Sequence, residues 1–233
     1  MNVVLLDLDG TLTRSEPGII AALRRAYDAM DLPLPDADEL RRFIGPSILE
    51  SFARNGVPEP LAQLGLRTFR MYYDEKAVFD RPHHPGIKIP GKYLGELYPG
   101  ILGQLERLHH AGYRLAVASC KPEYQAVPVC EHFGASKVLD DIFGASRDGS
   151  RRSKEQVIRY GFDRIGFDKA HSDRALMVGD RWTDVDGAKA VGIDCLGCGW
   201  GYAEPDELES HGAYRVLDRV DGLADAVEEY FAQ

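Results

Sequence analysis

Short runs of apolar residues recur along the chain and alternate with segments of helical periodicity. An apolar run that ends in polar residues or glycine is typical of a parallel strand that is buried on both faces. Residues 100–111 and 184–190 instead place apolar residues three and four apart, which predicts helices. The alternation predicts an α/β fold with a doubly wound, Rossmann-like parallel sheet. The predicted strands are residues 3–6, 114–118, 175–178 and 193–196.

The segment between the first two predicted strands is too long for a simple crossover connection. Its apolar residues follow helical spacing, for example in IIAALRRAYDAM and LAQLGLRTFRMYY. We therefore expect residues 15–96 to form an inserted α-helical cap domain, and residues 1–14 and 97–233 to form the core domain. Residues 81–100 are rich in proline and glycine and are expected to be an irregular return hinge. Residues 220–231 predict a final amphipathic helix.

Charge and hydropathy narrow the classes of partner. The 233 residues carry a formal net charge of −9 at pH 7, which opposes binding to nucleic-acid polymers and to anionic membranes. No apolar stretch reaches the roughly 20 residues that cross a bilayer, and the N-terminus lacks signal-peptide organisation. We therefore expect a cytoplasmic protein without a membrane partner, and the alternatives of monomer and homodimer stay open.

Polar residues follow three of the predicted strands, where ligands bind in open α/β sheets. Asp7 and Ser119 come directly after an apolar run and Asp180 comes one residue after another, so their side chains should meet at one edge of the sheet. Asp7 and Asp9 form a pair in which one carboxylate can meet an electrophile while the other manages protons. An Asp-Gly turn that merely ends a strand is the structural alternative. Asp184 follows Asp180 by one helical turn and adds a second hard oxygen ligand beside it.

The pentapeptide Asp7-Leu8-Asp9-Gly10-Thr11 resembles the first motif of the haloacid-dehalogenase-like superfamily. This resemblance implies that Asp7 is a nucleophile that accepts a phosphoryl group and that Asp9 is the general acid and base. It also implies that the Ser119 hydroxyl binds a phosphate oxygen, although a serine at a strand end is more often a helix cap. The implied cofactor is Mg²⁺, held by Asp7, the Asp9 carbonyl, Asp180 and Asp184.

The third motif of this superfamily is a lysine, and the best match is Lys154. Ser153 before it should cap a helix, and a lysine at a helix N-terminus suggests an anionic partner because the helix dipole disfavours a cation there. Lys121, Arg151 and Arg152 are rivals for the role. The spacing of Cys195 and Cys198 matches a redox or zinc pair, but we favour two buried thiols because no second such pair exists.

Longer stretches of the chain resemble the phosphoglycolate-phosphatase-like branch, especially members called 5'-nucleotidases. They include FIGPSILESF, SCKPE, VGDRWTDVDGAKAVGI and GCGWGYAEPDEL. The resemblance implies hydrolysis of a small phosphorylated metabolite, such as 2-phosphoglycolate or a nucleoside 5'-monophosphate. The alternatives are a phosphoryl transferase of the sugar-phosphate mutase kind and a non-catalytic binding protein. The residues expected to bind the substrate are Thr11, Arg42, Gly45, Ser119, Cys120 and Lys121.

Overall fold

The chain folds into two compact units. The computed structural model describes residues 1–233. The core unit comprises Met1–Thr13 and Leu97–Gln233, and the inserted unit comprises Arg14–Glu96. None of the helices combines the length and apolar character that crossing a membrane requires.

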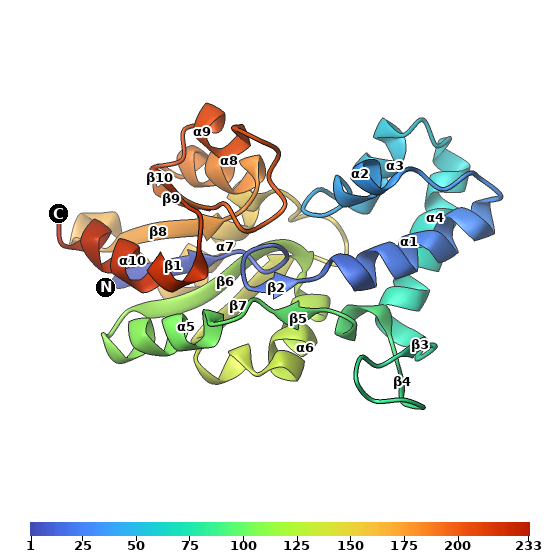
Figure 1. The fold of residues 1–233 in the computed structure, drawn as a ribbon. Helices are drawn as coiled ribbons and strands as arrows, with labels where there is room; N and C mark the ends of the chain where they lie inside the picture. The colour runs from blue at the N-terminus through green and yellow to red at the C-terminus, as the bar shows by residue number, and fades with distance from the viewer. The chain divides into compact units, whose positions relative to one another are not determined.

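A parallel sheet of six strands forms the centre of the core unit (Figure 1). Its strand order is β10-β9-β8-β1-β6-β7, so β1 lies between β8 and β6 although the three are far apart in sequence. Val4 of β1 pairs in register with Leu176 of β8 and Leu115 of β6. The strands are β1 (Asn2–Leu6), β6 (Arg114–Pro122), β7 (Asp141–Ala145), β8 (Arg174–Gly179), β9 (Asp194–Cys198) and β10 (Arg215–Leu217).

Helices cover both faces of this sheet, which explains why its strands are apolar throughout. Val4 and Leu6 pack on one face with α5 (Ile101–His110), α6 (Glu123–Phe133) and α10 (Leu223–Phe231). Val3 and Leu5 pack on the other face. That face is covered by α7 (Lys154–Ile165), α8 (Trp182–Ala190) and α9 (Glu207–His211). Three 3₁₀ turns complete the unit: η3 (Ala135–Lys137), η4 (Lys169–His171) and η5 (Val220–Gly222).

The observed sheet confirms the predicted α/β class and adds two strands. The four predicted strands correspond to β1, β6, β8 and β9. The strands β7 and β10 were not predicted, because β7 contains Asp141 and Gly144 and β10 has only three residues. The final helix begins at Leu223, after the short turn η5.

Helices also dominate the inserted unit. They are α1 (Glu16–Met30), α2 (Ala37–Arg41), α3 (Ile48–Arg54) and α4 (Glu59–Arg70), and α4 continues into the π-helical turn η1 (Met71–Glu75). Tyr27, Phe43 and Phe52 form an aromatic cluster with ring centroids 5.6–6.3 Å apart. A Cβ atom at Gly65 would lie 2.6 Å from the Met30 sulfur, so glycine allows α1 and α4 to pack closely.

The return segment of the chain is more regular than the predicted hinge. It contains the antiparallel pair β3 (Phe79–Asp80) and β4 (Lys88–Ile89), followed by the 3₁₀ turn η2 (Gly91–Tyr93). The exposed His83 and His84 lie in the loop of this hairpin. The short strands β2 (Thr13–Arg14) and β5 (Glu96–Leu97) pair where the chain leaves and re-enters the core unit.

Candidate active site

The topology of the core unit brings three motifs to the carboxyl edge of the sheet. Asp7 follows β1, and its backbone N–H donates to the carbonyl of Val178 in the neighbouring β8, at 2.9 Å. Gly10 has a φ of +95°, and a Cβ atom there would lie 2.0 Å from an oxygen of Asp180. Only glycine satisfies both conditions, so the loop after Asp7 is built around the Asp180 side chain.

Three buried aspartates gather at this edge. Carboxylate oxygens of Asp7, Asp180 and Asp184 lie within 4.8 Å of one another. Asp180 accepts hydrogen bonds from the Thr11 hydroxyl at 3.1 Å and from the Tyr202 backbone N–H at 2.8 Å. Asp184 accepts one from the Arg181 backbone N–H at 3.0 Å. Oδ1 of Asp7 and Oδ1 of Asp184 are buried, and neither accepts a hydrogen bond from a backbone N–H or a hydroxyl group.

Lys154 provides the positive charge inside this cluster. Its Nζ lies 2.9 Å from Oδ1 of Asp7 and 2.6 Å from Oδ1 of Asp184, and it donates to the Ala118 carbonyl at 2.7 Å. Burial opposes the charged lysine, but the adjacent carboxylates outweigh it and raise the pKa of Lys154. Ser153 caps α7 in a capping box, as predicted. Lys154 is therefore held as a cation at the start of α7.

One lysine leaves the three carboxylates short of positive charge. Burial, together with the charges of Asp184 and Asp7, raises the pKa of Asp180 well above its usual range. Burial also raises the pKa of Asp184 to about 6, although Lys154 opposes this rise. Closely spaced hard oxygen atoms from three buried carboxylates, which share only one lysine, suit a divalent cation such as Mg²⁺. The site therefore fits the expected metal, and Asp7, Asp180 and Asp184 could supply its side-chain ligands.

Replacing Asp180 by asparagine is expected to stabilise the metal-free protein at neutral pH. A carboxyl group whose pKa is raised by folding contributes fully to stability below its unfolded pKa, about 3.9 for aspartate. That contribution is lost as the pH rises through the folded value. At neutral pH the native protein without metal therefore carries an electrostatic cost that Asp180→Asn removes. Mg²⁺ should reverse the order, because binding to the folded state stabilises the native cluster more.

Thermal unfolding across about pH 4 to 8 measures this effect, with and without Mg²⁺. We expect the unfolding temperature of the metal-free native protein to fall relative to Asp180→Asn as the pH rises. Added Mg²⁺ should raise the unfolding temperature of the native protein most. A pH-independent difference between the two proteins, with no effect of Mg²⁺ on either, would refute this interpretation of the acid cluster.

Lys121 occupies a different position from Lys154. Its Nζ lies 2.6 Å from Oδ2 of Asp9, and both side chains are almost fully buried. The Ser119 hydroxyl accepts a hydrogen bond from the Lys121 backbone N–H at 3.2 Å, so Ser119 does not cap α6. The two lysines are thus divided between the two aspartates of the first motif, Lys154 with Asp7 and Lys121 with Asp9.

The remaining predicted residues are placed as follows. Thr11 is fully buried with its hydroxyl on Asp180, and Cys120 is half-buried beside Ser119 in β6. Arg42 and Gly45 belong to the inserted unit, where Arg42 pairs with Glu39 at 3.1 Å and Gly45 has a φ of +102°. Binding of substrate by these four residues, and of metal by the Asp9 carbonyl, stays a prediction.

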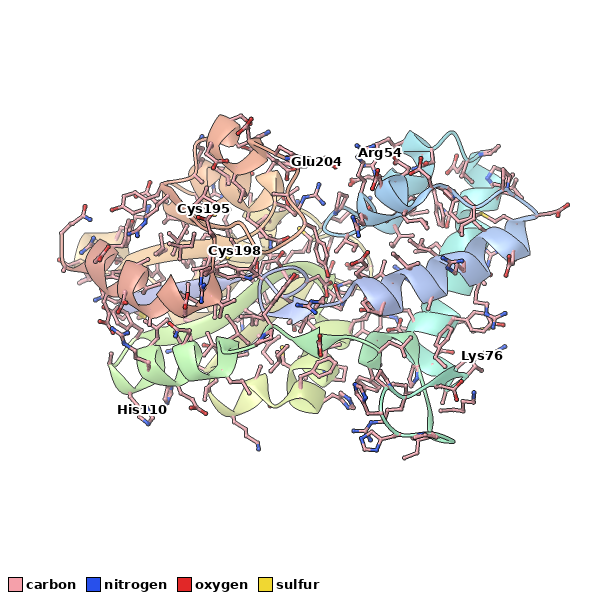
Figure 2. All side chains as sticks on the ribbon, in the orientation of Figure 1. Arg54, Lys76, His110, Cys195, Cys198 and Glu204 are labelled. Atoms are coloured by element: carbon pink, nitrogen blue, oxygen red, sulfur yellow. The ribbon has the colours of Figure 1, made fainter.

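The rival cations Arg151 and Arg152 hydrogen-bond to backbone carbonyls, and the two cysteines of the pair are buried. Arg151 donates to the Gly144 carbonyl at 2.8 Å and lies 3.6 Å from the centre of the Tyr160 ring. Arg152 donates to the Gly149 carbonyl. Cys195 and Cys198, labelled in Figure 2, are free buried thiols on β9, as we predicted, and burial raises the pKa of both.

Further residues that surround the acids come from the C-terminal part of the chain and were not predicted as site residues. Tyr202 and Gly201 contact Asp180, and Glu207 pairs with Arg181. Their sequence signal was the stretch GCGWGYAEPDEL, whose glycines allow a close backbone approach. A single sequence does not show which element such a stretch approaches.

Comparison with known proteins agrees with this geometry. Residues 4–198 match the model of the family described as haloacid dehalogenase-like hydrolase. A 5'-nucleotidase from Pseudomonas aeruginosa is 33% identical over 97% of this chain and 96% of its own length. A crystal structure of a predicted phosphatase from Clostridium acetobutylicum has a TM-score of 0.85 and 31% identity, with 98% of each chain covered. The chain therefore belongs to the haloacid dehalogenase-like hydrolase family.

Other relatives carry different names. The tyrosine-protein kinase PtkA of Mycobacterium tuberculosis is 36% identical over 89% of this chain, and the match spans only 65% of that relative. Further relatives are named phosphoglycolate phosphatase. The relatives that match over almost their whole length thus carry nucleotidase and phosphatase names.

Proposed function

We propose that the protein is a Mg²⁺-dependent phosphomonoesterase that acts through a phosphoryl group bound covalently to Asp7. The observation that carries the proposal is the Asp7 carboxylate. It is buried at a strand end, paired with Lys154 at 2.9 Å and grouped with two further acids that suit a divalent cation. A bound Mg²⁺ would screen the repulsion between this carboxylate and a phosphate dianion.

In the first half-reaction an oxygen of Asp7 attacks phosphorus and the bond from phosphorus to the ester oxygen breaks. Asp9, in its protonated form, gives its proton to the leaving alkoxide. Lys154 and the Ser119 hydroxyl bind oxygens of the phosphoryl group as charge develops on them. In the second half-reaction the Asp9 carboxylate takes a proton from water, and the water oxygen attacks phosphorus. The bond from phosphorus to the Asp7 oxygen breaks, so phosphate leaves and the Asp7 carboxylate is restored.

The proposed substrates are small phosphomonoesters such as 2-phosphoglycolate or a nucleoside 5'-monophosphate. The names of the relatives support both classes. The test measures phosphate release with Mg²⁺ from a panel of 2-phosphoglycolate, nucleoside 5'-monophosphates and sugar phosphates. Release that depends on the metal and favours one class supports the proposal, whereas no release from any member counts against it.

Replacing Asp9 by asparagine is expected to separate the two half-reactions. With alkyl phosphates both steps need a proton transfer, so turnover should fall by about 10² to 10⁴-fold. With p-nitrophenyl phosphate the leaving group needs no proton, so the first step should survive and the second should limit turnover. Rapid-mixing experiments should then show a burst of p-nitrophenolate. A variant that is slowed equally with both substrates, and without a burst, would remove Asp9 from this role.

Transfer of the phosphoryl group to an acceptor other than water is the second candidate. The relative named tyrosine-protein kinase is the observation that favours it. Incubation with ATP, Mg²⁺ and tyrosine-containing peptides, or with a sugar phosphate, distinguishes the two. Labelled peptide or an isomerised sugar supports transfer, and release of free phosphate alone supports hydrolysis.

A further inference from the structure

The loop between β9 and α9 lies directly against the acid cluster. A Cβ atom at Gly201 would lie 2.2 Å from the Cβ atom of Asp180, so the backbone touches this side chain. The next residue, Tyr202, donates its N–H to Oδ2 of Asp180 at 2.8 Å. One carboxylate oxygen of Asp180 is thus oriented by a loop that contains none of the predicted catalytic, substrate-binding or metal-binding residues.

The same loop is tied to the first motif. The indole N–H of Trp200 donates to the Thr11 carbonyl at 3.1 Å, and the Thr11 hydroxyl donates to Oδ1 of Asp180 at 3.1 Å. The two oxygens of Asp180 are therefore held from opposite ends of the chain. Any movement of this loop would change the direction in which Asp180 presents its oxygens.

Glu207 joins this loop to the helix that carries Asp184. Its carboxylate accepts hydrogen bonds from Arg181 Nε at 2.9 Å, from the Trp182 N–H at 2.8 Å and from the Glu204 N–H at 3.1 Å. The side chains of Arg181 and Glu207 are only 6% and 9% exposed. Glu204 lies in the loop itself (Figure 2), whereas Arg181 and Trp182 form the start of α8.

Glu207 is ionised in this setting. Burial opposes its charge, but the hydrogen bonds from Arg181 and from the two backbone N–H groups outweigh burial and lower the pKa of Glu207. A neutral amide at this position would keep the size of the side chain but lose the negative charge that faces the buried Arg181 guanidinium. Breaking one side of a buried ion pair leaves the other charge uncompensated, which favours rearrangement.

We propose that Glu207 is a positioning residue of the metal site, which fixes the loop of residues 199–206 and the start of α8 so that Asp180 and Asp184 present their oxygens together. This inference rests on the proposed function, because it assumes that the acid cluster binds Mg²⁺. Replacing a residue that orients metal ligands typically lowers the metal affinity by about 10 to 100-fold.

The test compares Glu207→Gln with the native protein by titration calorimetry of Mg²⁺ and by the Mg²⁺ concentration that gives half-maximal phosphatase activity. The Kd for Mg²⁺ and the Mg²⁺ concentration for half-maximal activity should both rise about 10 to 100-fold in Glu207→Gln. KM for the phosphomonoester at saturating Mg²⁺ should stay near the native value. Glu229→Gln is the matched control, because Glu229 forms an exposed ion pair with Arg215 on the surface of the core unit. It should bind Mg²⁺ as the native protein does.

A second variant protects the test against a protein that fails to fold. Gly201→Ala places a methyl group against Asp180 without removing any charge, and it should also weaken Mg²⁺ binding. If the native protein binds no Mg²⁺, the proposed function fails together with this inference. If the native protein binds Mg²⁺ and folded Glu207→Gln binds it equally well, the inference alone is overturned.

Discussion

Replacing Asp7 by asparagine should abolish phosphate release, with a loss of roughly three orders of magnitude or more in kcat. The amide has nearly the same shape as the carboxylate but cannot attack phosphorus, because its oxygen carries no negative charge. Lys154 and the other acids would remain in place, so substrate binding should change much less than turnover. Phosphate release at saturating Mg²⁺ and substrate measures this effect directly.

The fold of Asp7→Asn should be intact, and its metal-free form should not be less stable than the native protein. Asp7 raises the pKa of both Asp180 and Asp184, so the substitution removes a repulsive charge from a buried cluster. Asp221→Asn is the matched control, since Asp221 pairs with Arg219 on the surface and should leave turnover unchanged. Native-like turnover by a folded Asp7→Asn would exclude Asp7 as the nucleophile.

Replacing Lys154 by methionine should lower both activity and stability. The ammonium group lies within 2.9 Å of carboxylate oxygens of Asp7 and Asp184, in a side chain that is 1% exposed. Removing one partner from a buried ion pair typically costs about 3 to 5 kcal/mol in the free energy of unfolding. Loss of a preorganised cation at the reacting phosphate should lower kcat by about 10² to 10³-fold. Denaturant unfolding and phosphate release measure the two effects.

Added Mg²⁺ should act differently on the stability and on the activity of Lys154→Met. The metal should recover part of the lost stability, because it neutralises the carboxylates that the lysine no longer faces. It should not recover the activity, because the lysine is expected to bind the transferring phosphoryl group itself. Lys137→Met is the control, as Lys137 is an exposed residue of the core unit. An active and fully stable Lys154→Met would contradict the role of this lysine.

Apolar runs were sufficient to predict the class of fold and the edge of the sheet that carries the motifs. Residues 3–6 are apolar at every position because helices cover both faces of β1. Parallel strands place their carboxyl ends together, so Asp7 and Asp180 could be placed together before the structure was known. The short edge strand β10 could not be predicted in this way, because three residues carry no periodicity.

The local sequence pattern was not sufficient to predict which lysine contacts Asp7 and which contacts Asp9. Lys121 and Lys154 both come near the ends of core elements, and either could have faced Asp7. Lys121 contacts Asp9, which lies 112 residues away in the sequence. Lys154, at the start of α7, contacts Asp7, which is also far away in the sequence. Such contacts are set by how the sheet and its helices pack, which no local spacing encodes.

The same limit applies to Glu207 and to the substrate. In the sequence, Glu207 resembles an ordinary surface acid at the start of a short helix. Only the packed structure reveals its ion pair with the buried Arg181. Arg42 and Gly45 lie in the inserted unit, and their proposed part in substrate choice depends on side-chain contacts that a sequence motif does not determine. The family assignment was confirmed because it rests on motifs at short spacing.

The most direct test of the account is to identify the residue that carries the phosphoryl group. Asp9→Asn, mixed with p-nitrophenyl phosphate and Mg²⁺ and quenched with acid within the burst, should hold a covalent phosphate. Mass spectrometry of its peptides should place that phosphate on Asp7. Phosphate on any other residue, or turnover without a covalent phosphate at any time point, would contradict phosphoryl transfer through Asp7.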